Sequence, residues 1–135
     1  MLASLERAAH LIGVHVEHAA RELGITQAEA HVLVQLARGG ATSIATLHRE
    51  FGTKRSTLTN VLDRLEQRGL IRRELNREDR RSLTISLTRA GAPQARRLAR
   101  AMDLLEARVR DAVTERDVRG VEAVVDALAA ATNDA

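Results

Sequence analysis

One short segment interrupts the helical pattern of this 135-residue chain and constrains its fold more than any other. Apolar and hydroxyl residues alternate strictly along it: Leu83, Thr84, Ile85, Ser86, Leu87 and Thr88. This period of two predicts a half-buried β-strand, which needs a partner strand, expected at residues 71–75. The charged residues 76–82 then form the tip of a single hairpin inside an otherwise helical chain.

Helical spacing governs the rest of the chain, which has one proline and eight glycines. We expect helices at residues 2–22, at 26–38, from Thr42 or Ser43 to Gly52, at 54–68, from about Thr88, and from Thr114. Thr26 and Glu29 have the spacing of a capping box, in which each side chain accepts from the other residue's backbone N–H. The predicted fold class is mainly α with a small β-hairpin.

The two helices on either side of Gly52 and Thr53 form a predicted helix-turn-helix. The second of them has an apolar stripe facing the core: Leu58, Val61, Leu62 and Leu65. Its N-terminus presents Lys54, Arg55 and Ser56, where free N–H groups and the helix dipole favour phosphate or a base edge. Thr59 and Asn60 follow on the outward face, where Asn can pair with adenine and a Thr methyl can contact thymine. Asp63 would repel phosphate and is expected to pair locally.

The hairpin tip, residues 76–82, is the second candidate contact with DNA. Arginines on a narrow two-stranded projection can enter a minor groove, whose negative potential strengthens where the groove narrows. The candidate contacts are Arg77, Asp79, Arg80 and Arg81, with Asp79 predicted to hold one guanidinium group. Such a tip taken alone fits a solvated hairpin equally well, but beside a recognition helix it indicates a wing.

Charge and composition favour duplex DNA as the partner. Residues 53–100 carry a net charge of +8, whereas the whole chain carries +3, and such a basic segment suits a polyanion. Phe51 is the only aromatic residue among Phe, Trp and Tyr, so base stacking of the kind single-strand binders use is excluded. The chain has no cysteine, which excludes disulfides and thiol redox sensing.

Three motifs make the chain resemble the MarR family of bacterial transcriptional regulators over nearly its whole length. They are residues 56–59 (STLT), residues 62–71 (LDRLEQRGLI), and residues 78–82 (EDRRS) followed by residues 86–91 (SLTRAG). The resemblance implies a winged helix-turn-helix protein that binds a palindromic operator as an obligate homodimer and usually represses until a small ligand binds.

The resemblance also assigns individual residues at both contacts with DNA. It implies that Ser56, Thr57, Thr59 and Arg64 on the recognition helix face DNA. It further implies that Arg81 enters the minor groove and that Asp79 matches the aspartate of the wing. Arg77 departs from the pattern, because many relatives have proline there, which predicts a less rigid and more basic tip.

The two ends of the chain are the predicted dimerisation elements, residues 1–24 and 89–135, around a DNA-binding lobe at residues 26–88. Apolar residues recur at three- and four-residue steps along the first helix and the last two, a spacing typical of helix-on-helix packing. The residues expected at the dimer interface are Leu5, Ile12, Val16, Leu105, Val109, Val121, Val125 and Leu128.

Two alternatives stay open beside the ligand-responsive repressor. One is a winged-helix module that binds proteins and has lost DNA binding, against which the basic segment argues. The other is metal sensing by His15 and His18 with nearby carboxylates, although histidines on a packed helix are more often interface residues. We expect no metal, no cofactor and no catalytic residues, and an effector of unidentified kind. The chain shows no signal peptide or membrane-length apolar run, so we expect a cytoplasmic protein without membrane contact.

Overall fold

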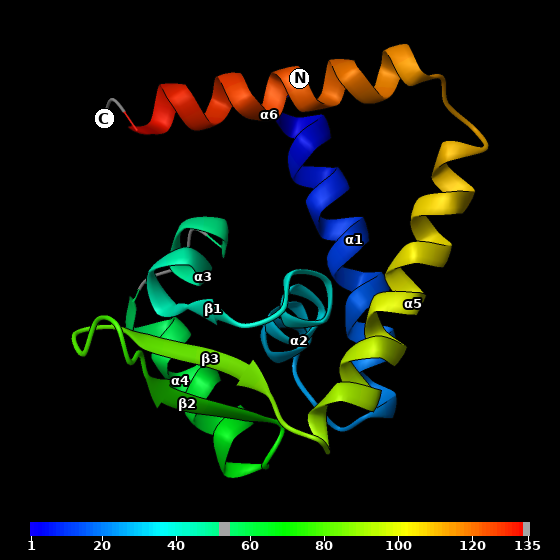
Figure 1. The fold of residues 1–135 in the computed structure, drawn as a ribbon. Helices are drawn as coiled ribbons and strands as arrows, with labels where there is room; N and C mark the ends of the chain where they lie inside the picture. Colours follow the sequence, from blue (N-terminus) through cyan, green and yellow to red (C-terminus); the bar gives the residue numbers. More distant parts are fainter. Residues whose placement is uncertain (52–54, 134–135) are drawn as a thin grey trace. The chain divides into compact units, whose positions relative to one another are not determined.

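A computed structural model describes residues 1–51 and 55–133, which divide into two compact units, Met1–Met102 and Asp103–Ala135. The first unit holds α1 (Leu2–Glu22), α2 (Gln27–Gly39), β1 (Thr42–Ser43), α3 (Ile44–Phe51), α4 (Arg55–Gln67), β2 (Ile71–Leu75), β3 (Leu83–Leu87) and the start of α5 (Gly91–Arg110). The second holds the end of α5 and α6 (Glu115–Asn133). The predicted class, mainly helical with a small antiparallel sheet, is confirmed (Figure 1). No helix within the described ranges is long and apolar enough to cross a membrane.

The sheet has three strands where the sequence predicted two. Strand β3 pairs with β2 in antiparallel register from Ile71 opposite Leu87 to Leu75 opposite Leu83, which confirms the hairpin. It also pairs with β1 on its other edge, giving the order β1-β3-β2. Strand β1 was missed because two residues are too few to show a period, and because Ser43 also caps α3 by accepting from the Thr46 N–H at 3.1 Å.

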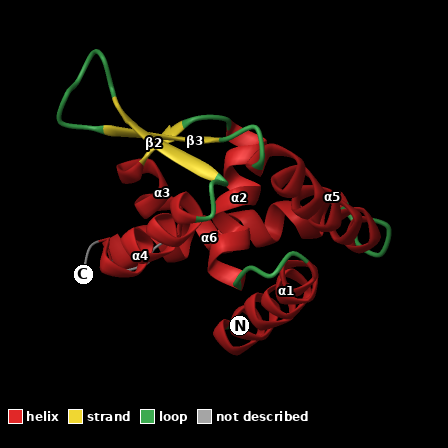
Figure 2. Ribbon diagram, turned by 90° about the horizontal axis from the view of Figure 1, so that it is seen from below, coloured by secondary structure: helices red, strands yellow, loops and turns green. Residues whose placement is uncertain are grey.

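The core of the first unit lies between the helices of the lobe and the sheet. Its largest fully buried side chains come from five elements: Leu33, Leu47, Leu62, Leu65, Ile71 and Ile85. Because α4 directs its apolar stripe into this core, its opposite face is turned to solvent. The hairpin projects beyond the helices, as Figure 2 shows.

The start of α5 packs closely on the start of the hairpin. Thr88 caps the helix by accepting from the Gly91 N–H at 3.0 Å, and the Ala92 N–H already donates to the Thr88 carbonyl. The continuous helix begins only at Gly91 because Pro93 has no N–H to donate. The cap lies at Thr88, where the sequence predicted that the helix starts.

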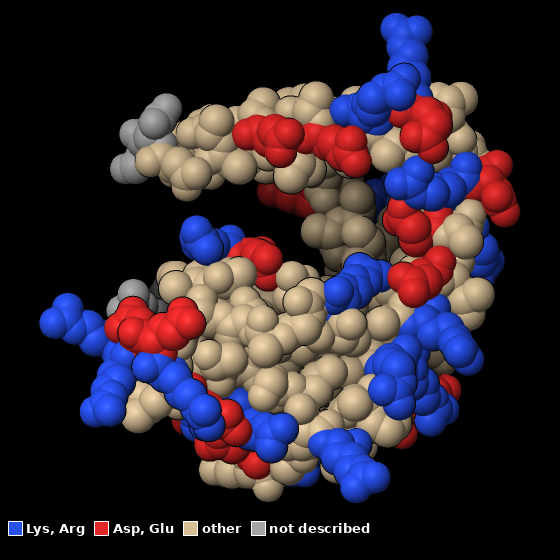
Figure 3. Space-filling model, in the orientation of Figure 1, with Lys and Arg blue, Asp and Glu red and all other residues tan. Residues whose placement is uncertain are grey.

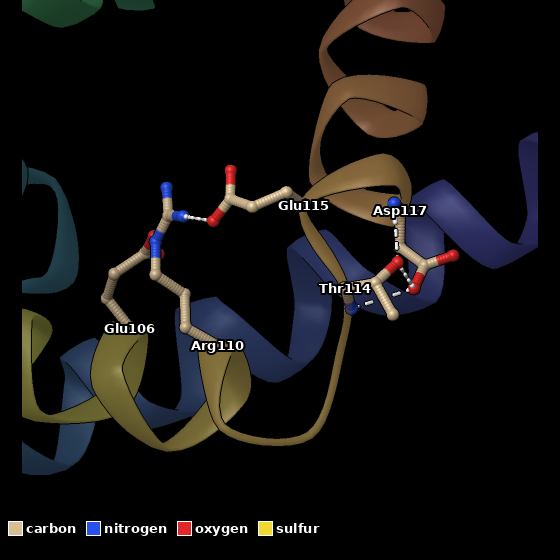
Figure 4. A network of polar contacts seen from close by, with 5 residues as sticks. All are labelled: Glu106, Arg110, Thr114, Glu115 and Asp117. Carbon is tan, nitrogen blue, oxygen red and sulfur yellow. Dashed lines mark hydrogen bonds and ion pairs between the residues drawn. The ribbon is translucent and has the colours of Figure 1, made fainter.

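In the second unit, a reciprocal capping box opens α6 (Figure 4). The Thr114 N–H donates to Asp117 Oδ2 at 2.9 Å, and the Asp117 N–H donates to Thr114 Oγ1 at 3.3 Å. These hydrogen bonds lower the pKa of the Asp117 carboxyl. Beside them Arg110 bridges Glu106 at 2.6 Å and Glu115 at 3.1 Å, which fixes the turn between α5 and α6.

Candidate nucleic-acid interface

The outward face of α4 carries most of the side chains predicted to read DNA. Ser56, Thr57, Thr59, Asn60 and Arg64 are all exposed, whereas the apolar residues between them are buried. Arg55 begins the helix. Lys54, together with the predicted stop at Gly52 and cap at Thr53, lies outside the described residues.

The tip of the hairpin is organised by its own polar residues. Asn76 Oδ1 accepts from the Glu78 N–H, and Asp79 Oδ1 accepts from the Arg81 N–H, both at 3.0 Å. The Ser82 N–H closes the turn on the Asp79 carbonyl at 3.1 Å. These turns define the tip without a proline at position 77.

The Asp79 carboxylate has a backbone partner within the tip. It holds the backbone at Arg81 and, among the residues that the structure describes, makes no ion pair with a guanidinium group. A backbone N–H two residues ahead is a nearer partner for this short side chain than a mobile arginine head. Arg77, Arg80 and Arg81 are consequently exposed around the tip, where Figure 3 shows blue side chains gathered at the left of the molecule.

Arg73 joins the wing to the recognition helix, a contact that the sequence analysis missed. Its Nη2 lies 2.7 Å from Asp63 Oδ1 and 2.9 Å from Glu66 Oε1, and its Nε and backbone N–H both donate to Glu66 Oε2 at 3.2 Å. These bonds lower the pKa of the Glu66 carboxyl and raise the pKa of Arg73. The local pairing predicted for Asp63 is confirmed. An arginine on the inward face of a strand was the available signal, since position 73 shares a face with the buried Ile71.

Glu29 makes a second contact that sequence reasoning misassigned. The Thr26 half of the capping box is confirmed, because Thr26 Oγ1 accepts from the Glu29 N–H at 3.2 Å. The Glu29 carboxylate does not return the bond to Thr26. It accepts from Arg64 Nε on α4 at 3.0 Å instead, because its residue is only 3% exposed and is directed toward that helix.

A cavity of about 450 Å³ opens between α2, α3 and the first half of α4. It is lined by Gln27, Ala28, His31, Val32, Glu50, Phe51, Thr57, Leu58 and Val61. The His31 ring lies 6.3 Å from the Phe51 ring between centroids. Burial lowers the pKa of His31, which favours its neutral form in this cavity.

The residues predicted for the dimer interface divide into buried and accessible ones. Val16 is 2% exposed and belongs to the core of its own chain, so its assignment to the interface is wrong. The heptad spacing could not separate packing within the chain from packing against a partner. Leu5 and Leu105 are half-buried, and the others are exposed: Ile12, Val109, Val121, Val125 and Leu128.

His15 has a partner within its own chain. Its Nε2 lies 3.1 Å from the Ala101 carbonyl oxygen, so this nitrogen carries the proton and donates it to α5. Across residues 1–51 and 55–133, no group of three or more histidine and carboxylate side chains is placed to hold a metal ion.

A helix-turn-helix followed directly by a projecting hairpin defines the winged helix-turn-helix class. Residues 25–83, from the start of the lobe into β3, match the model of the MarR family. This part of the chain is therefore similar to the MarR family.

Individual proteins are also similar to this chain, either in sequence or in fold. The chain is 38% identical over 68 residues to the HTH-type transcriptional repressor MdtR of Bacillus subtilis (strain 168), a match covering 50% of this chain and 44% of MdtR. The chain therefore spans less than half the length of that relative. Its fold is similar to that of S. aureus MepR in the DNA-binding conformation, with a TM-score of 0.86, 19% identity and 98% of each chain covered. It is also similar to overoxidized AbfR bound to DNA, with a TM-score of 0.71, 25% identity, and 94% of this chain and 88% of AbfR covered.

Proposed function

We propose that this protein is a sequence-specific transcriptional regulator that binds double-stranded DNA. The main observation in support of this proposal is that the two elements predicted to contact DNA belong to the same compact unit. The exposed polar face of α4 and the arginine-bearing tip are linked through Arg73, which is hydrogen-bonded to Glu66 on α4. AbfR, which shares the fold, has been seen bound to DNA, and this supports the proposal.

In this proposal α4 lies in a major groove and the tip in the neighbouring minor groove. Ser56, Thr59 and Asn60 contact base edges, and Thr57 and Arg64 complete the helix face. Arg81 enters the minor groove, while Arg77 and Arg80 contact phosphates. Asp79 supports these contacts by holding the backbone of the tip.

We further propose that the protein acts as a homodimer on a palindromic operator. Large apolar side chains on the helices outside the lobe support this, because Val121 and Val125 are 56% and 51% exposed and Ile12 is 42% exposed. Large apolar side chains that are exposed in this way on a helix are typical of an association site. Sedimentation equilibrium on the wild type and on Val121→Asp tests it, and a monomeric wild type contradicts it.

Repression that is relieved by a small effector is the regulatory part of the proposal. The cavity bounded by α2, α3 and α4 supports it, because a ligand there would contact Leu58 and Val61 on the back of the recognition helix. Thermal-shift screening of small molecules tests this part. A hit that raises the melting temperature equally in wild type and in Val61→Trp would place the site elsewhere.

Selection of bound duplexes from a random pool tests the central proposal. We expect a palindrome whose half-sites are roughly one helical turn apart. Binding should weaken steeply with salt, and Arg81→Ala should cost about 1–3 kcal/mol of binding free energy. A wild type that enriches no sequence but captures a protein would instead support the winged-helix interaction module without DNA binding.

A further inference from the structure

A buried carboxylate stands directly behind the recognition helix. Glu29, in the first turn of α2, is 3% exposed and is the one buried charged residue of the parts of the chain that the structure describes. Its Oε1 accepts from Arg64 Nε at 3.0 Å, whereas its Oε2 is buried without a hydrogen-bond partner. A carboxylate in this position is costly to bury unless it has a specific partner.

The partner reaches the surface that faces DNA. The Arg64 side chain is 50% exposed although its Nε is held by Glu29. Because the guanidinium group is planar, one bond at Nε limits the orientations of the two Nη groups. Glu29 thereby restricts the direction in which Arg64 can donate and offsets its charge.

A second arginine ties the same carboxylate to the end of α1. Arg68 Nη1 lies 3.9 Å from Glu29 Oε2 and donates to the Gly24 carbonyl at 2.5 Å, while its Nη2 donates to the Leu23 carbonyl at 3.3 Å. Glu29, Arg64 and Arg68 thus form one cluster that joins α4 to the turn between α1 and α2. The position of Arg64 is set by the lobe as well as by its own helix.

We propose that Glu29 is a positioning residue for sequence discrimination, acting through Arg64 without touching DNA itself. This inference rests on the proposed DNA-binding function. With Glu29 in place, Arg64 is aimed in one direction and its charge is partly neutralised, so it contributes little to indiscriminate phosphate binding. Without the carboxylate, Arg64 is free to follow any nearby phosphate, which strengthens non-specific binding and weakens the preference for the operator.

The test measures the ratio between the affinity for the operator duplex and the affinity for a scrambled duplex. Fluorescence anisotropy gives Kd for the selected operator duplex and for a scrambled duplex of the same length and composition, each over a range of salt concentrations. Glu29→Gln keeps the size of the side chain and an acceptor for Arg64 but removes the charge. Glu78→Gln removes one charge from the exposed tip and serves as the matched control.

We expect Glu29→Gln to lower the ratio of specific to non-specific affinity by about tenfold, within the range of measured couplings in charged networks. Its binding to the scrambled duplex should strengthen and gain a salt slope of roughly 0.9 for each added phosphate contact. Glu78→Gln should strengthen both affinities together and leave the ratio unchanged. A ratio for Glu29→Gln within twofold of the wild type overturns the proposal.

A double-mutant cycle separates positioning from a general effect on the fold. If Glu29 acts through Arg64, then Glu29→Gln should not change the ratio when introduced into Arg64→Gln. A change that persists undiminished in that background overturns the proposal. If Glu29→Gln does not fold, Arg64→Lys is used to test the proposal, because it keeps the positive charge but removes the planar guanidinium group. An unchanged ratio of specific to non-specific affinity in Arg64→Lys overturns the proposal. A wild type that binds neither duplex contradicts the proposed DNA-binding function itself.

Discussion

Replacing Gly91 with alanine would force α5 away from the hairpin. A Cβ at position 91 would lie 1.9 Å from the Leu70 carbonyl oxygen, 2.7 Å from its carbonyl carbon and 3.0 Å from its Cα. These atoms are backbone, so no side-chain rotation can relieve the overlap. The two segments must separate by about 1.5 Å to bring the Cβ and the Leu70 oxygen to ordinary contact. That movement would also weaken the hydrogen bond from the Thr88 N–H to the Leu70 carbonyl, now 3.1 Å long.

We expect Gly91→Ala to destabilise the protein by about 3 kcal/mol, combining an overpacking cost of about 2 kcal/mol with about 1 kcal/mol for the hydrogen bond. The melting temperature should fall by roughly 10 °C at equal protein concentration, as followed by circular dichroism. Gly39→Ala is the matched control, because a Cβ there has no atom within 4 Å, and it should change stability by less than about 1 kcal/mol. Equal melting temperatures for the two variants would refute the close approach of α5 to Leu70.

Three further predictions concern single side chains. Arg73→Met should lower the urea midpoint of unfolding and make that midpoint less sensitive to acid pH than in the wild type. The reason is that the lowered pKa of Glu66 contributes stability that is present above about pH 4.5 and is lost on acidification. His31→Phe should remove a loss of stability below pH 6.5, since the lowered pKa of His31 means that the unfolded chain binds the proton more readily; unfolding at pH 5.5 and 7.5 measures it. Thr114→Ala should cost about 1 kcal/mol through loss of the α6 cap, as measured by thermal unfolding, and an unchanged melting temperature would contradict that cap.

Periodicity predicted the elements of the lobe well because it reports local burial. The alternation at residues 83–88 anticipated β3 at Leu83–Leu87, and the apolar stripe of residues 58–65 anticipated which face of α4 enters the core. Helix ends could also be predicted where a residue type has one clear structural role, such as a threonine that caps a helix. The helix expected from about Thr88 is indeed capped by the Thr88 hydroxyl group.

Contacts between side chains were not accessible in the same way, because they depend on which elements meet in space. Glu29 and Arg64 are 35 residues apart, and only the packing of α2 on α4 brings them together. The spacing of Thr26 and Glu29 suggested only a local role for Glu29, in the capping box, and gave no sign of its contact with Arg64. Val16 is a second example. The regular apolar spacing on α1 predicted that it lies at a dimer interface, but it packs in the core of its own chain.

The ion pairs also change where free positive charge lies in the proposed DNA interface. Arg73 is neutralised by Asp63 and Glu66, and Arg64 is held by Glu29. Arg77, Arg80 and Arg81 are exposed at the tip. The net charge of residues 53–100 therefore overstates the surface available to phosphate, and the tip should dominate the salt dependence of binding.

This distribution predicts different outcomes for neighbouring arginines. Arg77→Ala and Arg80→Ala should each reduce the salt slope by about one per protomer and weaken operator and scrambled duplexes alike. Arg81→Ala should in addition relax sequence preference, because a minor-groove contact depends on groove width whereas a phosphate contact does not. Anisotropy titrations on both duplexes measure each effect. If Arg77→Ala changed sequence preference as much as Arg81→Ala, the assignment of Arg81 alone to the groove would be wrong.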